Sequence, residues 1–173
     1  MFGDPKSNPF GFKIAPVSNV ALELIAGGDK PVDNSLEQTD IFKYPVYSNG
    51  ETNDGLLCFS RGYRVDKPAI TISARGAIGY SSIRGPYFTP VVRLLSIVPD
   101  DCVNIVYLKY YIDSQKVTGT GSSQGQLTLP EFKKLQVLVP PIELQEKYAA
   151  FVQQSDKSKL IVSDQLRFNI QRA

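Results

Sequence analysis

The chain has 173 residues, 42% hydrophobic and 21% charged, a length that suits one globular domain with room for an appendage. It contains no His, which excludes Ser-His-Asp and Cys-His catalytic arrangements and Cys2His2 zinc sites. Its two cysteines, Cys58 and Cys102, form no CxxC pair. We therefore expect reduced thiols, no bound metal or cofactor, and a cytoplasmic protein. No apolar run approaches the roughly 18 residues that span a membrane.

The net charge of +2 is distributed unevenly along the chain. Residues 1–60 hold four Lys and eight acidic residues, whereas residues 61–99 hold five Arg and one Lys against a single Asp. The basic residues of this second block are Arg61, Arg64, Lys67, Arg75, Arg84 and Arg93. Because the planar guanidinium suits phosphates and base edges, the block indicates nucleic acid. Composition alone leaves a solvated basic face open as the alternative.

The first 60 residues predict an arm, a helix and two strands. Residues 1–16 contain three prolines and show little periodicity, which indicates a connecting arm. Residues 17–25 predict a short helix that begins at Ser18 and ends at Gly27 and Gly28. The strands are expected at Tyr44–Tyr47, followed by a turn, and at Leu56–Ser60.

The middle of the chain continues with β patterns and then short helices. Ala69–Ser73 is a nearly continuous β-branched run, which predicts a strand buried on both faces. A further strand is expected at 91–98 and a helix at 104–115, where Val and Tyr recur at helical spacing. An uncharged Gly/Ser/Thr/Gln-rich segment precedes a helical turn at 129–134 and a last strand at 135–139.

After two prolines, Ile142–Ile170 predicts one long polar helix of about 43 Å, at 1.5 Å per residue. Its apolar stripe is narrow, and through residue 162 it follows the alternating four- and three-residue spacing of a coiled-coil seam. We expect this seam to contact a partner helix through Leu144, Tyr148, Phe151, Val162, Leu166 and Ile170. A helix folded back on its own sheet stays open as the alternative.

One enzymatic interpretation remains for the acidic residues. Pro99-Asp100, together with Glu131 and Lys133, satisfies the loose PD-(D/E)xK pattern of Mg²⁺-dependent nucleases. Those enzymes hold their carboxylates at the ends of adjacent strands, whereas Glu131 and Lys133 follow Pro130 on an expected helical turn. The pattern is therefore kept only as an alternative hypothesis.

Four segments in order carry a resemblance to a known family. They are YPVYSNG at 44–50, KPAITISARGAIG at 67–79, GQLTL at 125–129 and VPPIELQE at 139–146. In this order, followed by the seam-bearing helix, they resemble the specificity subunit of type I restriction-modification systems. The resemblance covers the chain from about residue 1 to its end.

The resemblance implies a DNA-recognition role without catalysis. A full subunit of this family has two target recognition domains, each followed by a long helix, and the two helices pack antiparallel as a spacer. Each domain reads one half of a bipartite site. The subunit positions modification subunits that methylate adenine, and motor-nuclease subunits join them.

This sequence is similar to the C-terminal half of such a subunit, either a naturally separate half or an excised piece. The resemblance thus implies a target recognition domain over 1–141 and a spacer or dimerisation helix over 142–173. The expected fold is α+β, with a twisted, mainly antiparallel sheet and short helices. Expected partners are double-stranded DNA, the modification subunit, the restriction motor-nuclease subunit, and a second recognition domain or copy bound through the C-terminal helix.

Candidate DNA contacts fall into two groups. Phosphate contacts are expected from Lys67, Arg84 and Lys116. Base contacts are expected from Arg61, Arg64 and Arg75, with Tyr80 and Gln124 in support. Loops at 47–49, with Tyr47 and Asn49, and at 118–124 are further candidates. Besides the nuclease, a generic coiled-coil adaptor without DNA affinity remains a third hypothesis.

Overall fold

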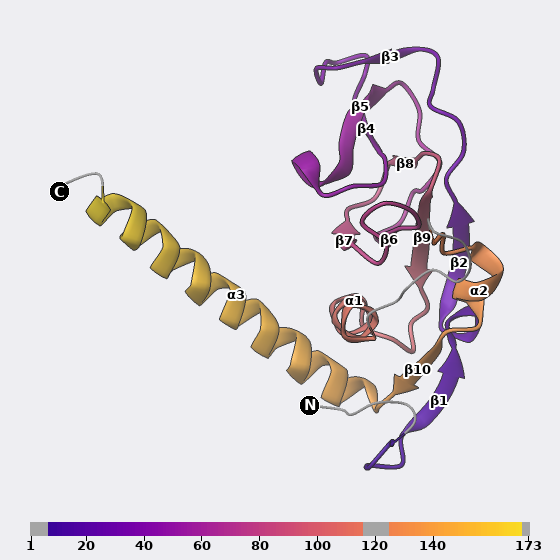
Figure 1. Cartoon of the computed structure of the whole chain (residues 1–173), viewed down its shortest axis with the longest axis vertical. Coiled ribbons are helices and arrows are strands. Elements are labelled where there is room, and N and C mark those ends of the chain that lie inside the picture. The colour runs from indigo at the N-terminus through magenta and orange to yellow at the C-terminus, as the bar shows by residue number, and fades with distance from the viewer. Residues whose placement is uncertain (1–6, 116–124, 171–173) are drawn as a thin grey trace.

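The computed structural model describes residues 7–115 and 125–170, with side chains through residue 156 and at residue 158. Over these residues, two four-stranded sheets and a two-stranded ribbon carry short helices, and the last helix extends away from them (Figure 1). The predicted α+β class with mainly antiparallel pairing is confirmed. The strands are divided among three sheets instead of one.

The first sheet forms the centre of the domain. Its strands lie in the order β2 (Ala21–Ala26), β9 (Leu94–Pro99), β6 (Ala69–Ser73) and β7 (Ser81–Arg84), and every neighbouring pair is antiparallel. All five residues of β6 are buried, as its β-branched run predicts.

The second sheet holds the strands predicted at Tyr44–Tyr47 and Leu56–Ser60, which are confirmed with these bounds. Its order is β3 (Asn34–Ser35), β5 (Leu56–Ser60), β4 (Tyr44–Tyr47) and β8 (Thr89–Pro90). Strands β4 and β8 are parallel, and the other pairs are antiparallel. The short 3-10 turn η2 (Thr52–Gly55) connects β4 to β5.

The ribbon pairs β1 (Lys13–Pro16) with β10 (Gln136–Val139), so that the two ends of the domain meet. Helix α1 (Ile105–Ser114) begins at Asn104, whose side chain accepts hydrogen bonds from two backbone amides of the first turn. Helix α2 (Leu129–Lys133) begins at Thr128 with a capping box. The main core joins these helices to the first sheet and β10 through Ile70, Ile97, Tyr107, Leu108, Phe132 and Leu138. Each such buried side chain contributes about 1.5–3 kcal/mol.

The helix predicted at 17–25 is wrong. Residues Val17–Asn19 form a single 3-10 turn, η1, and β2 follows at Ala21–Ala26. Ser18 does not cap this turn, because its hydroxyl donates to the Asn19 side chain. Pairing of β2 with β9 satisfies the backbone of this segment, and that tertiary pairing overrides the local helical pattern.

The strand predicted at 91–98 begins three residues late, at Leu94. Arg93 adopts a left-handed φ of +70°, so the chain turns before the ladder starts. Val91 instead forms an isolated bridge with Gly28. The elements predicted at 104–115, 129–134 and 135–139 are confirmed as α1, α2 and β10. Each end agrees with the prediction or differs from it by one residue.

The last helix, α3, runs over Ile142–Ile170, the bounds that the sequence predicts. It starts beside α1 and β10 and leads away from both sheets (Figure 1). Among the described residues, no helix combines the length and the apolar character that crossing a membrane requires.

Candidate nucleic-acid interface

The loop between β4 and β5 has an unusual backbone conformation. Asn53 and Asp54 both lie in the left-handed region with φ of +50°, and Gly55 follows with φ of +76°. A Cβ atom on Gly55 would lie 2.6 Å from the Ser48 carbonyl oxygen, so only glycine fits there. The Ser48 amide donates to the Gly55 carbonyl at 2.8 Å and closes the loop. This conformation turns the Asp54 carboxylate toward β7.

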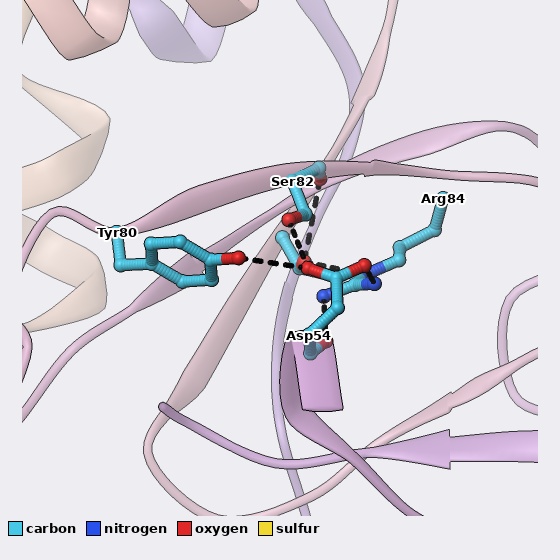
Figure 2. Close-up of polar contacts among 5 residues, drawn as sticks. Asp54, Tyr80, Ser82 and Arg84 are labelled. Carbon is cyan, nitrogen blue, oxygen red and sulfur yellow. Dashed lines mark hydrogen bonds and ion pairs between the residues drawn. The ribbon is translucent and has the colours of Figure 1, made fainter. Parts of the chain in front are cut away.

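Asp54 is the centre of a polar cluster that joins the two sheets, shown in Figure 2. Its Oδ1 accepts from the Tyr80 hydroxyl at 2.9 Å and the Ser82 hydroxyl at 2.6 Å, and its Oδ2 pairs with Arg84 Nη1. We call Asp54, Tyr80, Ser82 and Arg84 the clamp. Burial alone would raise the pKa of Asp54, but the hydrogen bonds from Ser82, Tyr80 and Arg84 and the charge of Arg84 hold it below its usual value.

The Arg84 guanidinium makes hydrogen bonds, an ion pair and a ring contact within the domain. Its side chain is only 4% exposed, and its Nη2 donates to the Asp54 carbonyl at 2.6 Å. Nε donates to Thr71 Oγ1 at 3.0 Å, and Cζ lies 3.9 Å from the centre of the Tyr47 ring. The prediction of a phosphate contact for Arg84 does not fit this burial. We assign it instead to holding the loop at 48–55 in place.

A second set of hydrogen bonds ties this loop to the loop at 74–80. Asn49 Nδ2 donates to the Arg75 carbonyl at 3.0 Å, and the Gly50 amide donates to Ser73 Oγ at 3.1 Å. We call residues 48–55 and 74–80 together the two-loop edge. The structure thus gathers Asn49, Arg75 and Tyr80 at this edge, with Tyr47 and Arg84 beneath it.

Arg61 and Arg64 lie away from this edge, at the end of the second sheet. Arg61 is exposed, pairs with Asp33, and lies with Cζ 4.9 Å from the centre of the Phe42 ring. Tyr63 packs edge-on against Tyr44 and Tyr87, with both ring-centre distances 4.9 Å. Arg64 is exposed. The predicted base-reading arginines therefore occupy two separate places.

Of the remaining predicted DNA contacts, Lys67 lies in the described part of the chain, whereas Lys116 and Gln124 do not. Lys67 Nζ lies 3.8 Å from Glu23, and both side chains are about half exposed. Such a pair contributes at most about 1 kcal/mol, so a phosphate can replace the carboxylate. Lys116, Gln124 and the whole loop predicted at 118–124 lie outside the described residues.

The predicted seam of α3 only partly matches the buried face of that helix. The buried positions are Gln145, Ala149 and Val152, which sequence reasoning did not select. Tyr148, a predicted seam residue, packs against α1 of the same chain, with its ring centre 6.0 Å from that of Tyr107. Leu144 and Phe151 remain 38% and 60% exposed. The side chains of Val162, Leu166 and Ile170 lie outside the described part of the helix.

Glu131, the central residue of the alternative nuclease pattern, has a structural role. Glu131 lies on α2, not on a strand, and its Oε2 accepts from the Thr128 amide at 2.9 Å and hydroxyl at 2.7 Å. No group of three or more His, Cys, Asp or Glu suited to a metal ion occurs among the described residues. This geometry does not favour Mg²⁺ chemistry.

Sequence reasoning missed Asp54 and Ser82. The Asn-Asp-Gly sequence at 53–55 does indicate left-handed backbone, and that signal was available. The partners of Asp54 lie 26 to 30 positions further along the chain, and they come near only because the connection between β4 and β5 contacts β7 of the other sheet.

Comparison with known proteins identifies relatives over nearly the whole chain. The family model described as type I restriction modification DNA specificity domain matches residues 15–171. Two type I specificity subunits of Mycoplasma pneumoniae are each 34% identical, over 80% and 81% of this chain. The chain spans only 38% and 42% of their lengths. A protein named as the C-terminus of another such subunit from this organism is 34% identical over 56% of this chain and 66% of its own length.

Solved structures show the same fold. A chain in a structure of an assembled type I restriction-modification system superposes with a TM-score of 0.72 and 18% identity, over 93% of this chain and 42% of that chain. The HsdS subunit of Thermoanaerobacter tengcongensis gives a TM-score of 0.68 and 18% identity, over 91% of this chain and 40% of its own.

Proposed function

This chain belongs to the type I restriction modification DNA specificity family, and we propose that it reads one half of a bipartite DNA site and docks an adenine methyltransferase subunit. Proteins of this family are non-catalytic DNA-recognition components. The chain spans about two fifths of the length of the two Mycoplasma pneumoniae relatives. In this proposal residues 1–141 form the recognition domain, and residues 142–173 form a spacer helix.

The two-loop edge is the observation that carries the proposal. The Arg75 carbonyl accepts a hydrogen bond from the Asn49 side chain, and the clamp holds the loop at 48–55 against β7. A base-reading side chain contributes more to affinity when its backbone is fixed before DNA binds, because less ordering entropy is lost on binding. Arg75 is therefore proposed to contact a guanine edge, with Asn49 and Tyr80 beside it.

The remaining basic residues are proposed as contacts outside this edge. Arg61 and Lys67 form exposed ion pairs with Asp33 and Glu23, and weak pairs of this kind exchange readily for phosphates. Arg61 and Arg64 lie at the end of the second sheet beside Tyr63, so they would extend the contact beyond the two-loop edge. Lys116 and Gln124 keep their predicted roles as phosphate and base contacts.

The exposed face of α3 supports a helical partner. Leu144 and Phe151 are seven positions apart, the period of a coiled coil, and both remain exposed beside the buried face. A second recognition domain or another copy of the chain would cover them, with Val162, Leu166 and Ile170 continuing the seam. Phe151→Glu should weaken this assembly in analytical ultracentrifugation, whereas Gln153→Glu on an exposed position of the same helix should not.

The proposal is tested by selecting DNA with the chain assembled on its methyltransferase subunit. A random duplex pool is bound, washed at rising salt, and sequenced. We expect one short half-site to be enriched and the binding constant to fall steeply with salt, since phosphate contacts release counterions. A pool that remains random after several rounds, although the subunits assemble, would overturn the proposal.

A further inference from the structure

Gln145, in the first turn of α3, is a buried polar residue that does not belong to the two-loop edge. Its side chain is 0% exposed. Nε2 donates to the Pro140 carbonyl at 2.8 Å and to the Cys102 carbonyl at 3.2 Å, while Oε1 accepts from the Asn104 amide at 2.9 Å. Both donors and the acceptor of the amide are thus used on backbone groups. Two of these groups belong to the segment that leads into α1.

A second contact holds α3 further along its length. Tyr110 on α1 donates its hydroxyl to Asp156 Oδ2 at 2.5 Å, and Tyr148 packs edge-on against Tyr107. Asp156 follows Gln145 by eleven residues, about 16 Å along the helix axis. Helix α1 is itself fixed to the sheet, because Ser81 on β7 donates to Asp113 at 2.5 Å. Because α3 is held at Gln145 and again at Asp156, and α1 is fixed to the sheet, the direction of α3 relative to the sheet is defined.

We propose that Gln145 is a positioning residue that sets the angle at which α3 leaves the recognition domain, and so sets the distance between the two half-sites. This inference rests on the proposed function. From Gln145 to the end of α3 at Ile170 the helix is about 37 Å long, so a tilt of about 5° at Gln145 moves the far end by about 3 Å, close to one base-pair step. Small changes at Gln145 therefore become changes in spacing on DNA.

The chemistry of the residue favours orientation over packing energy. Burying an amide is costly unless its hydrogen bonds are made, and Gln145 offsets that cost only where all three backbone partners are within reach. An apolar residue packs acceptably at several helix angles, whereas the three hydrogen bonds of Gln145 are satisfied at only one. Gln145→Met keeps the volume and removes this restriction, which makes it the informative variant.

The first test measures the helix direction without DNA. Spin labels are attached at Ile83→Cys on β7 and Gln154→Cys on α3, both exposed positions, in a chain carrying Cys102→Ser and keeping the buried Cys58. Pulsed electron paramagnetic resonance should give a single narrow distance in this parent chain and in the control Gln153→Met. Gln145→Met should lose that single distance. An unchanged narrow distribution in Gln145→Met would overturn the inference.

The second test measures spacing on DNA. Chains carrying Gln145→Met or Gln153→Met are assembled with the methyltransferase subunit, and methylated sites are sequenced. Gln145→Met should keep the half-site sequence and lose the preference for one spacer length, whereas Gln153→Met should keep both. A single unchanged spacer in Gln145→Met overturns the inference while leaving the proposed function intact. Failure of the unsubstituted chain to select any half-site counts against the proposed function, and the spin-label distances then decide on Gln145 separately.

A folding defect is distinguished from a loss of direction by a second variant. Gln145→Asn keeps the amide but is one methylene shorter, so it cannot reach all three backbone partners. Thermal denaturation identifies which variants fold. We expect every folded Gln145 variant to lose the single distance, and a folded variant that retains it contradicts the inference.

Discussion

Asp54→Ala removes the centre of the clamp and leaves Arg84 without its counter-ion. Because the Arg84 side chain is 4% exposed, its charge cannot recover hydration without opening the joint between the two sheets. Removing one partner of a fully buried ion pair costs about 3–5 kcal/mol. The Asp54 side chain is 55% exposed, so water replaces part of the loss and we expect about 2–3 kcal/mol. For a chain of this size, that lowers the melting temperature by about 4–12 °C.

Asp33→Ala is the matched control for this measurement. It breaks the Arg61–Asp33 pair, whose side chains are 58% and 63% exposed, and such a pair contributes only about 0.2–1 kcal/mol. Urea unfolding and calorimetry of both variants give the comparison. We also expect the double variant Asp54→Ala/Arg84→Met to be less destabilised than the sum of its single variants, since it leaves no unpaired charge. Equal losses for Asp54→Ala and Asp33→Ala would refute the role of the clamp.

Three other predictions follow from the site and its surroundings. Arg75→Ala should relax base preference in the selected half-site, whereas Lys67→Ala should lower affinity for cognate and scrambled DNA alike and reduce the slope of log affinity against log salt by about 1. Competition binding distinguishes the two variants. An equal loss of affinity for both DNAs in Arg75→Ala contradicts its assignment to a base contact. Because the pKa of Asp54 is lowered in the fold, its contribution to stability is fully present above the usual carboxyl value of 3.8 and is lost as pH falls through the lower folded value. The melting-temperature gap between the unsubstituted chain and Asp54→Asn should therefore stay constant above about pH 5 and close under stronger acid, and a gap that widens in acid is the opposite result. Burial raises the pKa of both thiols, and only Cys102 is exposed, so a thiol reagent should label one cysteine slowly in the native chain and two in denaturant; rapid native labelling of Cys58 would show that its strand opens.

Local patterns predicted most of the elements because their causes are local. The β-branched run at Ala69–Ser73, the Asn104 cap of α1 and the capping box at Thr128 are each encoded within a few residues. The helix expected at 17–25 was wrong because β2 depends on a partner, β9, whose paired residues lie 69 to 78 positions away. No local pattern carries that information.

In the candidate site too, some features follow from residue type and others depend on contacts between distant parts of the chain. The arginine-rich block contains Arg75, and the structure places Asn49, Arg75 and Tyr80 together at one edge. Residue type alone could not show that Arg84 is buried, since its position depends on Asp54 across the joint between the sheets. Likewise, the apolar spacing of α3 could not single out Gln145, because its hydrogen-bond partners are backbone groups at 102–104 and at Pro140.

The central claim, that this chain specifies the DNA sequence of one half-site, is tested most directly by mapping N6-methyladenine in cells that co-express it with the methyltransferase subunit. We expect methylation to depend on the chain and to occur in a bipartite motif. One half of that motif should match the half-site that the chain selects from random DNA, and it should change in Arg75→Ala. An inverted repeat of that half-site would indicate that two copies pair through α3. Methylation that is identical without the chain, or a motif that lacks the selected half-site, would contradict the account.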